Sequence, residues 1–263
     1  MKSGLKLTGI FLVSLFAMAS NAQDNKAQES SAQDYRKLSF EMFDAARDGN
    51  VESIRKLLDR GVPIHARNRF GNTALIYAAR AKQTKVIDLL LDSGADINKP
   101  NLSGKTALME ASLNGDLALA KHLISKGADV NAETIEHFTA LIFATYHGHS
   151  DIATYLISQS AKIDVIDNSG KSAGIYAAAN NNASLLDAFI TAGLNVNARY
   201  ENDLTALMWA AGYGSVETAA KLLAAGADQK VRDNRGKNAL DIATEKGHNG
   251  IVELLESAAK KNG

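Results

Sequence analysis

The chain has 263 residues, 46% of them hydrophobic, and its 29 basic and 29 acidic side chains leave no formal net charge at pH 7. A nucleic-acid-binding domain usually carries an excess of positive charge, so this balance argues against a nucleic-acid partner. The chain has no cysteine, which excludes a disulfide framework, thiolate catalysis and cysteine-ligated zinc.

Residues 1–22 have the pattern of a secretory signal peptide. Lys2 and Lys6 give a positive start, a mostly apolar run covers residues 7–19, and small residues end the segment at Ala22. The apolar run is shorter than the roughly 20 residues that span a bilayer, so cleavage after Ala22 is favoured over retention as a membrane anchor. A cysteine-free exported chain suits the oxidising bacterial periplasm. We therefore expect a periplasmic protein without a membrane span after cleavage, with secretion as the alternative.

The next segment, residues 23–34, has almost no apolar side chain to bury and is predicted to be a flexible leader. Apolar residues then return at helical spacing from Phe40 and Phe43 onward. They predict a first packed unit over residues 35–67. This unit lacks the threonine that marks most later units, and we interpret it as an N-terminal cap.

From Asn68 onward, two triplets return at steps of 33 residues and divide the chain into similar units. A fixed period of this length predicts a solenoid, in which each unit buries its apolar face on its neighbours. The last unit is more polar and is interpreted as a C-terminal cap. A Thr-Ala-Leu triplet starts at Thr73, Thr106, Thr139 and Thr205, with weaker forms at Ser172 and Asn238. A Gly-Ala-Asp triplet starts at Gly94, Gly127 and Gly226, with weaker forms at Ser160 and Gly193. Units two to seven are predicted over 68–100, 101–133, 134–166, 167–199, 200–232 and 233–263.

The two triplets have physical roles at helix ends. A threonine side chain accepts a hydrogen bond from backbone N–H groups that have no partner inside the helix. A glycine after a helix takes the left-handed conformation at little cost. The spacing thus predicts a helix, a turn, a second helix and a glycine exit in each unit. His137 and Asp203 replace a turn glycine found in other units, so those two turns need another way to bend.

These features resemble the ankyrin repeat, which has 33 residues and the signature Thr-Pro-Leu-His-x-Ala. The resemblance runs from about Phe40 to the C-terminus and implies an all-α solenoid of about seven helix-turn-helix units with short β-hairpin-like fingers. The signature proline is alanine in most units. The signature histidine is replaced by Ile76, Met109 and their counterparts, so we expect apolar packing to substitute for its hydrogen bonds between turns.

The resemblance also implies a protein partner, bound on a concave face built from the finger tips and the first helix of each unit. Large apolar and aromatic side chains fall at several contact positions of that face, and these residue types dominate interface energies. In unit five the contact positions include Lys171 and Asn180. The predicted partner-binding residues are Phe70, Leu102, Leu113, Ile135, Phe138, Tyr146, His147, Trp209 and Tyr213.

A second aromatic stripe recurs at multiples of 33 residues and is interrupted by Glu110. Its position favours core packing. Trp209 is the exception, because it lies one turn before Tyr213 and the two could form a hot spot. The stripe consists of Tyr77, Phe143, Tyr176 and Trp209.

The sequence offers little support for chemistry. No nucleophile elbow or phosphate-binding loop is present, so we expect no catalysis and no cofactor or metal. His147 and His149 are two residues apart, which would place them on different faces of a helix. A competing hypothesis is an enzyme or a metal or small-ligand binder that uses these two residues and His137.

The favoured interpretation is a monomeric, non-catalytic protein-binding scaffold. Its partner is a protein, and its role could be to protect an exported enzyme or to neutralise a toxin. A secreted effector that acts in a host cell is the alternative.

Overall fold

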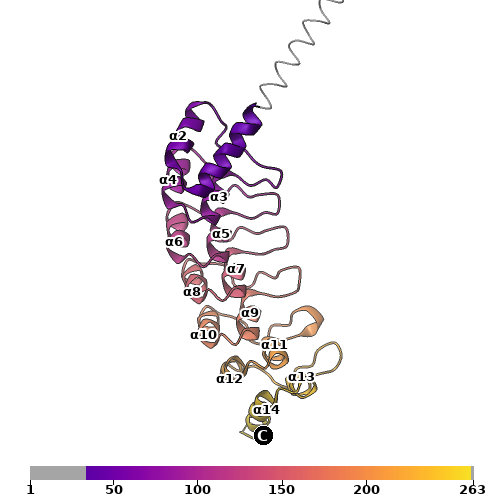
Figure 1. The fold of residues 1–263 in the computed structure, drawn as a ribbon. Helices are drawn as coiled ribbons and strands as arrows, with labels where there is room; N and C mark the ends of the chain where they lie inside the picture. Colours follow the sequence, from indigo (N-terminus) through magenta and orange to yellow (C-terminus); the bar gives the residue numbers. More distant parts are fainter. Residues whose placement is uncertain (1–33, 262–263) are drawn as a thin grey trace, which may run out of the picture.

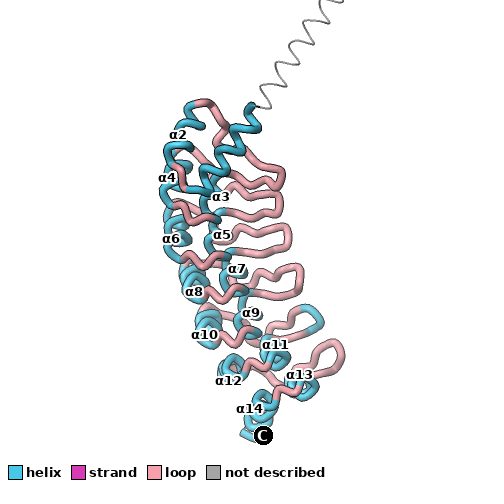
Figure 2. Tube along the Cα trace, viewed as in Figure 1, coloured by secondary structure: helices cyan, strands magenta, loops and turns pink. Residues whose placement is uncertain are grey.

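The computed structural model describes residues 34–261. The predicted signal peptide and the leader up to residue 33 lie outside the described residues. Within them the chain forms an all-helical solenoid, as predicted, in which pairs of short helices stack into a curved array (Figure 1). Loops project from one side of this array, between successive helix pairs (Figure 2).

The helices form two columns, which we call inner and outer because the array bends around the inner one (Figure 1). A helix over residues 34–48 precedes both columns, and the 3₁₀ helix η1 (Glu201–Asp203) lies in a loop. The inner column comprises α3 (Ala74–Arg80), α5 (Ala107–Leu113), α7 (Ala140–Tyr146), α9 (Ala173–Ala179), α11 (Ala206–Tyr213) and α13 (Ala239–Lys246). The outer column comprises α2 (Val51–Asp59), α4 (Thr84–Asp92), α6 (Leu117–Ser125), α8 (Ser150–Ser158), α10 (Ala183–Thr191), α12 (Val216–Ala224) and α14 (Asn249–Lys261).

Side-chain caps define where the inner helices begin. The hydroxyl of Thr73 accepts from the backbone N–H of Ile76, and Thr106, Thr139 and Thr205 make the same bond in their units. Ser172, one of the weaker forms, makes no side-chain cap bond. Helices of this length are unstable alone, so stacking must supply most of their stability.

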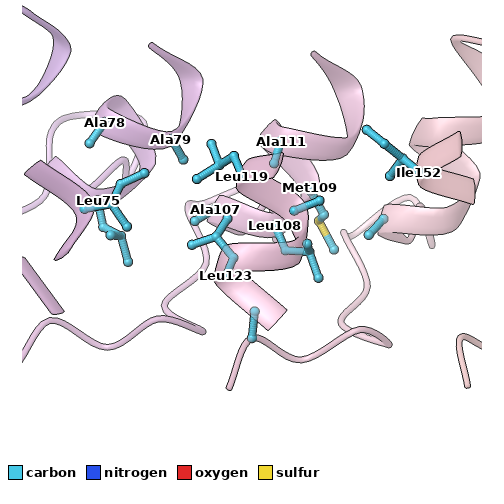
Figure 3. Packing of buried hydrophobic residues seen from close by; sticks show 14 of the residues in the cluster. Leu75, Ala78, Ala79, Ala107, Leu108, Met109, Ala111, Leu119, Leu123 and Ile152 are labelled. Carbon is cyan, nitrogen blue, oxygen red and sulfur yellow. The ribbon is translucent and has the colours of Figure 1, made fainter. Parts of the chain in front are cut away.

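The core explains why the helices stack closely. Leucines such as Leu75 and Leu108 and alanines such as Ala78 are buried between neighbouring helices (Figure 3). Small alanines let successive helices approach. The buried residues form two clusters, one from Met42 to Phe189 and one from Ile175 to Leu255, and the clusters meet in unit five.

Side-chain hydrogen bonds also join the units, at positions that differ from the signature histidine. The amide of Asn98 donates to Gly127 O at 3.2 Å and accepts from the N–H of Asp129 at 2.8 Å. Asn197 makes the corresponding pair of bonds one unit from the end of the array. The expectation that apolar packing alone replaces the bonds of the signature histidine is therefore incomplete, because asparagine side chains also link neighbouring units.

The loops between units are hairpin-shaped fingers, each built on a five-residue turn. In the finger of unit three, Asn101 N–H donates to Lys105 O at 2.9 Å, and the Asn101 side chain accepts from the N–H groups of Ser103 and Lys105. Neighbouring fingers are joined by bonds such as Ile135 N–H to Ser103 O. The strands are too short to count as β-structure, and the described residues contain an isolated bridge between Ile166 and Ser172.

Two fingers bend without glycine at their fourth position. The fingers of units two and three have Gly71 and Gly104 there, at φ 76° and 84°. His137 and Asp203 take φ 60° and 59° at the same position. The turn is therefore kept, because His137 and Asp203 adopt the strained left-handed backbone conformation.

Candidate functional site

A groove of about 360 Å³ lies on the inner column where three successive units meet. Tyr146 at the end of α7 and Tyr213 at the end of α11 form two of its walls and are 51% and 60% exposed. Tyr176 of α9 lies between them and is buried. We call it the aromatic groove; its lining residues are Tyr146, Lys171, Tyr176, Ala179, Asn180 and Tyr213.

Ring contacts fix the aromatic side chains of the groove. The rings of Tyr146 and Tyr176 meet edge to face, with centroids 5.1 Å apart. Trp209, one turn before Tyr213, stacks on it at 6.0 Å. Such contacts favour one ring orientation over others, so the shape of the groove is set by contacts within the chain.

A hydrogen bond ties the floor of the groove to the finger of unit five. The hydroxyl of Tyr176 donates to Asp167 Oδ2 at 2.6 Å, and Asp167 Oδ1 accepts from the N–H groups of Ser169 and Lys171. Burial and the hydrogen bond to Asp167 raise the pKa of Tyr176 to about 12. Both oxygens of this buried carboxylate are thus satisfied inside the protein.

Lys171 lies over the aromatic side chains. Its Nζ is 4.8 Å from the ring centroid of Trp209 and 5.9 Å from that of Tyr176. Two units earlier, Lys105 Nζ lies 5.0 Å from the ring of Phe143. Each contact is a cation–π interaction, and each puts a positive charge on the inner face.

The predicted partner-binding residues fall into three groups. Phe70, Leu102 and Ile135 are exposed on fingers and do not line the groove. Tyr146 and Tyr213 line the groove, and His147 is exposed beside Tyr146 with ring centroids 5.1 Å apart.

The remaining three, Leu113, Phe138 and Trp209, are half-buried. Phe138 was expected to be an exposed contact residue, but its ring packs 5.2 Å from that of Phe143 and against the core. The backbone carbonyl of Leu113 contacts the ring of His149 in the next unit. The indole N–H of Trp209 is buried and makes no hydrogen bond with any described residue.

Lys171 is a groove residue outside the predicted partner-binding set, and Tyr176 is predicted as core. The usable signal was the spacing: Lys171 precedes Tyr176 by five residues in its unit, and Trp209 follows Tyr176 by 33. That register places a lysine beside two successive rings of the aromatic stripe.

The histidines do not form one site. His147 and His149 lie in the turn between α7 and α8, not on different faces of a helix, and their rings stack 6.3 Å apart. His149 Nε2 contacts Leu113 O at 3.0 Å, whereas His137 pairs with Glu133 in a finger. Burial, the neighbouring His149 and Lys105 lower the pKa of His147. Among residues 34–261, no three histidine, cysteine or acidic side chains are arranged to hold a metal ion.

An ion pair between a buried carboxylate and a half-exposed guanidinium lies in the aromatic stripe, where Glu110 interrupts it. Arg80 of α3 contacts Glu110 of α5 through both ends of its guanidinium, at 2.8 and 3.3 Å. The Glu110 side chain is 3% exposed and that of Arg80 is 46% exposed. The hydrogen bond to Glu110 raises the pKa of Arg80, and the pair joins units two and three.

Comparison with known proteins assigns the family. A family model described as ankyrin repeats (3 copies) matches residues 42–134, 98–168, 133–200 and 175–263. The chain therefore belongs to the ankyrin repeat family, whose stacked repeats typically form a scaffold with an extended surface for binding proteins. No helix of residues 34–261 combines the length and apolar character needed to span a membrane.

Many solved structures match the fold. One is the crystal structure of the ankyrin repeat domain of Bcl-3, described as a unique member of the IkappaB protein family. It superposes with a TM-score of 0.71 at 24% sequence identity and covers 82% of this chain and 97% of that one. At this identity the likeness shows the fold alone. A comparison with curated proteins found no match.

Proposed function

We propose that this chain is an exported, non-catalytic scaffold that binds a partner protein on its inner face, with the aromatic groove at the centre of the contact. The observation that carries the proposal is a pair of half-exposed tyrosines, Tyr146 and Tyr213, which line one groove and are each held by contact with a second aromatic ring. Tyrosine and tryptophan in a central pocket supply most of the affinity in many protein interfaces.

The rigidity of the groove supports the same function. Each element that bounds it is tied to a neighbour, the finger of unit five through Asp167 and Tyr176, and the end of α11 through Trp209 and Tyr213. A surface that is already ordered loses little conformational entropy on binding. The exposed finger residues Phe70, Leu102 and Ile135 extend the surface on which specificity can be built.

The test is affinity capture from an extract of the source cell. The native chain, in the form that the cell produces, is the bait beside a variant with Tyr146→Ala, Trp209→Ala and Tyr213→Ala. Tyr155 lies on α8 of the outer column, so Tyr155→Ala removes a tyrosine from the opposite side and serves as control. We expect one protein to be retained by the native chain and the control and lost from the triple variant. Circular dichroism should show that all three chains are folded. Equal capture by all three chains would place the contact elsewhere.

Export is supported by the composition of residues 1–22 and has its own test. Cell fractionation followed by sequencing of the N-terminus should find a periplasmic protein that begins at Gln23. A full-length chain in the cytoplasm would contradict export but would leave the binding surface unaffected.

A further inference from the structure

Three fingers carry a lysine at their fifth position, and one of the three is neutralised within the chain. Lys237 Nζ lies 2.5 Å from Glu245 Oε2 on α13, and this contact lowers the pKa of Glu245. The residues in register with Glu245 beside the other two lysines are Leu113 and Ala179. The chain therefore provides a carboxylate for the last lysine and an apolar side chain for the other two.

Lys105 and Lys171 instead lie over aromatic rings and have no carboxylate within ion-pair distance among residues 34–261. An ammonium group has three N–H donors, and a ring face occupies only one side of it. Lys171 makes one long bond, to Ser169 O at 3.5 Å. The nearby carboxylate of Asp167 is already occupied by Tyr176 and two backbone N–H groups.

We infer that the segment bound in the aromatic groove is acidic: an extended stretch of a partner protein whose carboxylates pair with Lys171 and Lys105 while its apolar side chains pack on Tyr146 and Tyr213. This inference rests on the proposed function. A carboxylate from outside would supply what Glu245 supplies to Lys237. The cationic side chains lie beside aromatic rings, so the charge is held in place before binding.

Negative charges on the fingers indicate that the acidic part of the bound partner segment lies near the helices. Glu136 and Glu201 are exposed on fingers and would repel carboxylates there. Neither forms an ion pair with Lys105 or Lys171 among the described residues. The acidic positions of the partner should thus contact the finger bases, at Lys105 and Lys171.

The test selects peptides from a random 12-residue display library on the full chain and on three variants. Lys171→Gln removes the charge and keeps an extended polar side chain, one atom shorter than lysine. Lys237→Gln removes a lysine from the same finger position, already paired inside the protein, and is the matched control. In the third variant, Lys105→Glu with Lys171→Glu, the charge of the surface is reversed.

We expect peptides rich in Asp and Glu, with aromatic or aliphatic neighbours, to be enriched on the native chain and on Lys237→Gln. Individual peptides should bind roughly fivefold more weakly to Lys171→Gln. The charge-reversed variant should select basic peptides instead. Thermal unfolding of each variant checks that the fold is kept.

Other outcomes separate this inference from the proposed function. Peptides without acidic residues that are lost on Tyr146→Ala or Tyr213→Ala would overturn the acidic partner and keep the binding groove. Peptides that no inner-face substitution affects would overturn both. Failure to enrich any peptide on the native chain would also count against the inference, since an extended segment would then be insufficient for binding.

Discussion

The ion pair between Arg80 and Glu110 gives a prediction in which the two partners are not equivalent. Replacing Arg80 with leucine leaves a carboxylate whose side chain is 3% exposed, whereas replacing Glu110 leaves a guanidinium that is already 46% exposed. A buried carboxylate without a partner is costly, but a half-exposed guanidinium can be hydrated. We therefore expect Arg80→Leu to be more destabilising than Glu110→Leu.

The structure sets the size of the effect. Removing one partner of a buried ion pair costs about 3–5 kcal/mol in general. Water can reach Glu110 through the space that Arg80 vacates, which reduces the expected cost of Arg80→Leu to about 2 kcal/mol. Glu110→Leu should cost about 1 kcal/mol or less. In the double variant both charges are gone and the free energy of unfolding should be within about 1 kcal/mol of the native value.

Urea unfolding measures these differences with two probes. Far-ultraviolet circular dichroism reports on all helices, and fluorescence reports on unit six, because Trp209 is the only tryptophan in the chain. Coincident transitions would justify treating the array as one cooperative unit. An Arg80→Leu variant that loses no more stability than Glu110→Leu, or a double variant less stable than either single one, would refute the reasoning.

Two further substitutions test the finger and the exit turn. Tyr176→Phe should cost about 1–3 kcal/mol in urea unfolding, because Asp167 Oδ2 loses its buried donor. The pKa of Tyr176 is raised from 10.0 to about 12. Its contribution to stability is therefore full below pH 10 and is lost as the pH rises through 12. Thermal unfolding of the native chain should show that loss, and Tyr176→Phe should not. Ser160→Gly should stabilise by about 1 kcal/mol, because Ser160 has φ 63° where other units have glycine, and an unchanged urea midpoint would contradict this.

The fold could be predicted from the sequence because each triplet has a local physical role. Thr73 and its counterparts cap helices wherever they occur, and Gly94 takes φ 91° as a helix exit requires. The 33-residue period then determines which helices of successive units stack on each other. The weaker triplet at Ser172 also precedes a helix, but it makes no cap bond although serine is a favoured N-cap residue.

The aromatic groove was harder to predict because its residues come from three units. Whether a side chain lines the groove or packs in the core depends on the side chains of the neighbouring unit, and the 33-residue period alone does not describe those contacts. Phe138 and Tyr146 both occupy contact positions, yet Phe138 packs on Phe143 and Tyr146 stays half-exposed. The turn histidines show the same difficulty: His149 contacts Leu113 O of the preceding unit, a partner that spacing within its own unit does not indicate.

The groove lies where the two apolar clusters of the core meet. The two apolar clusters meet in unit five, where the helix α9 contains Gly174 and its cap bond is missing. At this point polar and aromatic contacts add to the apolar packing of α9, chiefly Tyr176 with Asp167 and Lys171 over Trp209. These same contacts shape the groove and orient its lysine. A partner that pairs with Lys171 and packs on Tyr146 and Tyr213 would bridge units four to six, so binding should stabilise the array most around unit five. Hydrogen exchange of α9 and α11 with and without a selected peptide would measure this, and protection confined to other units would contradict it.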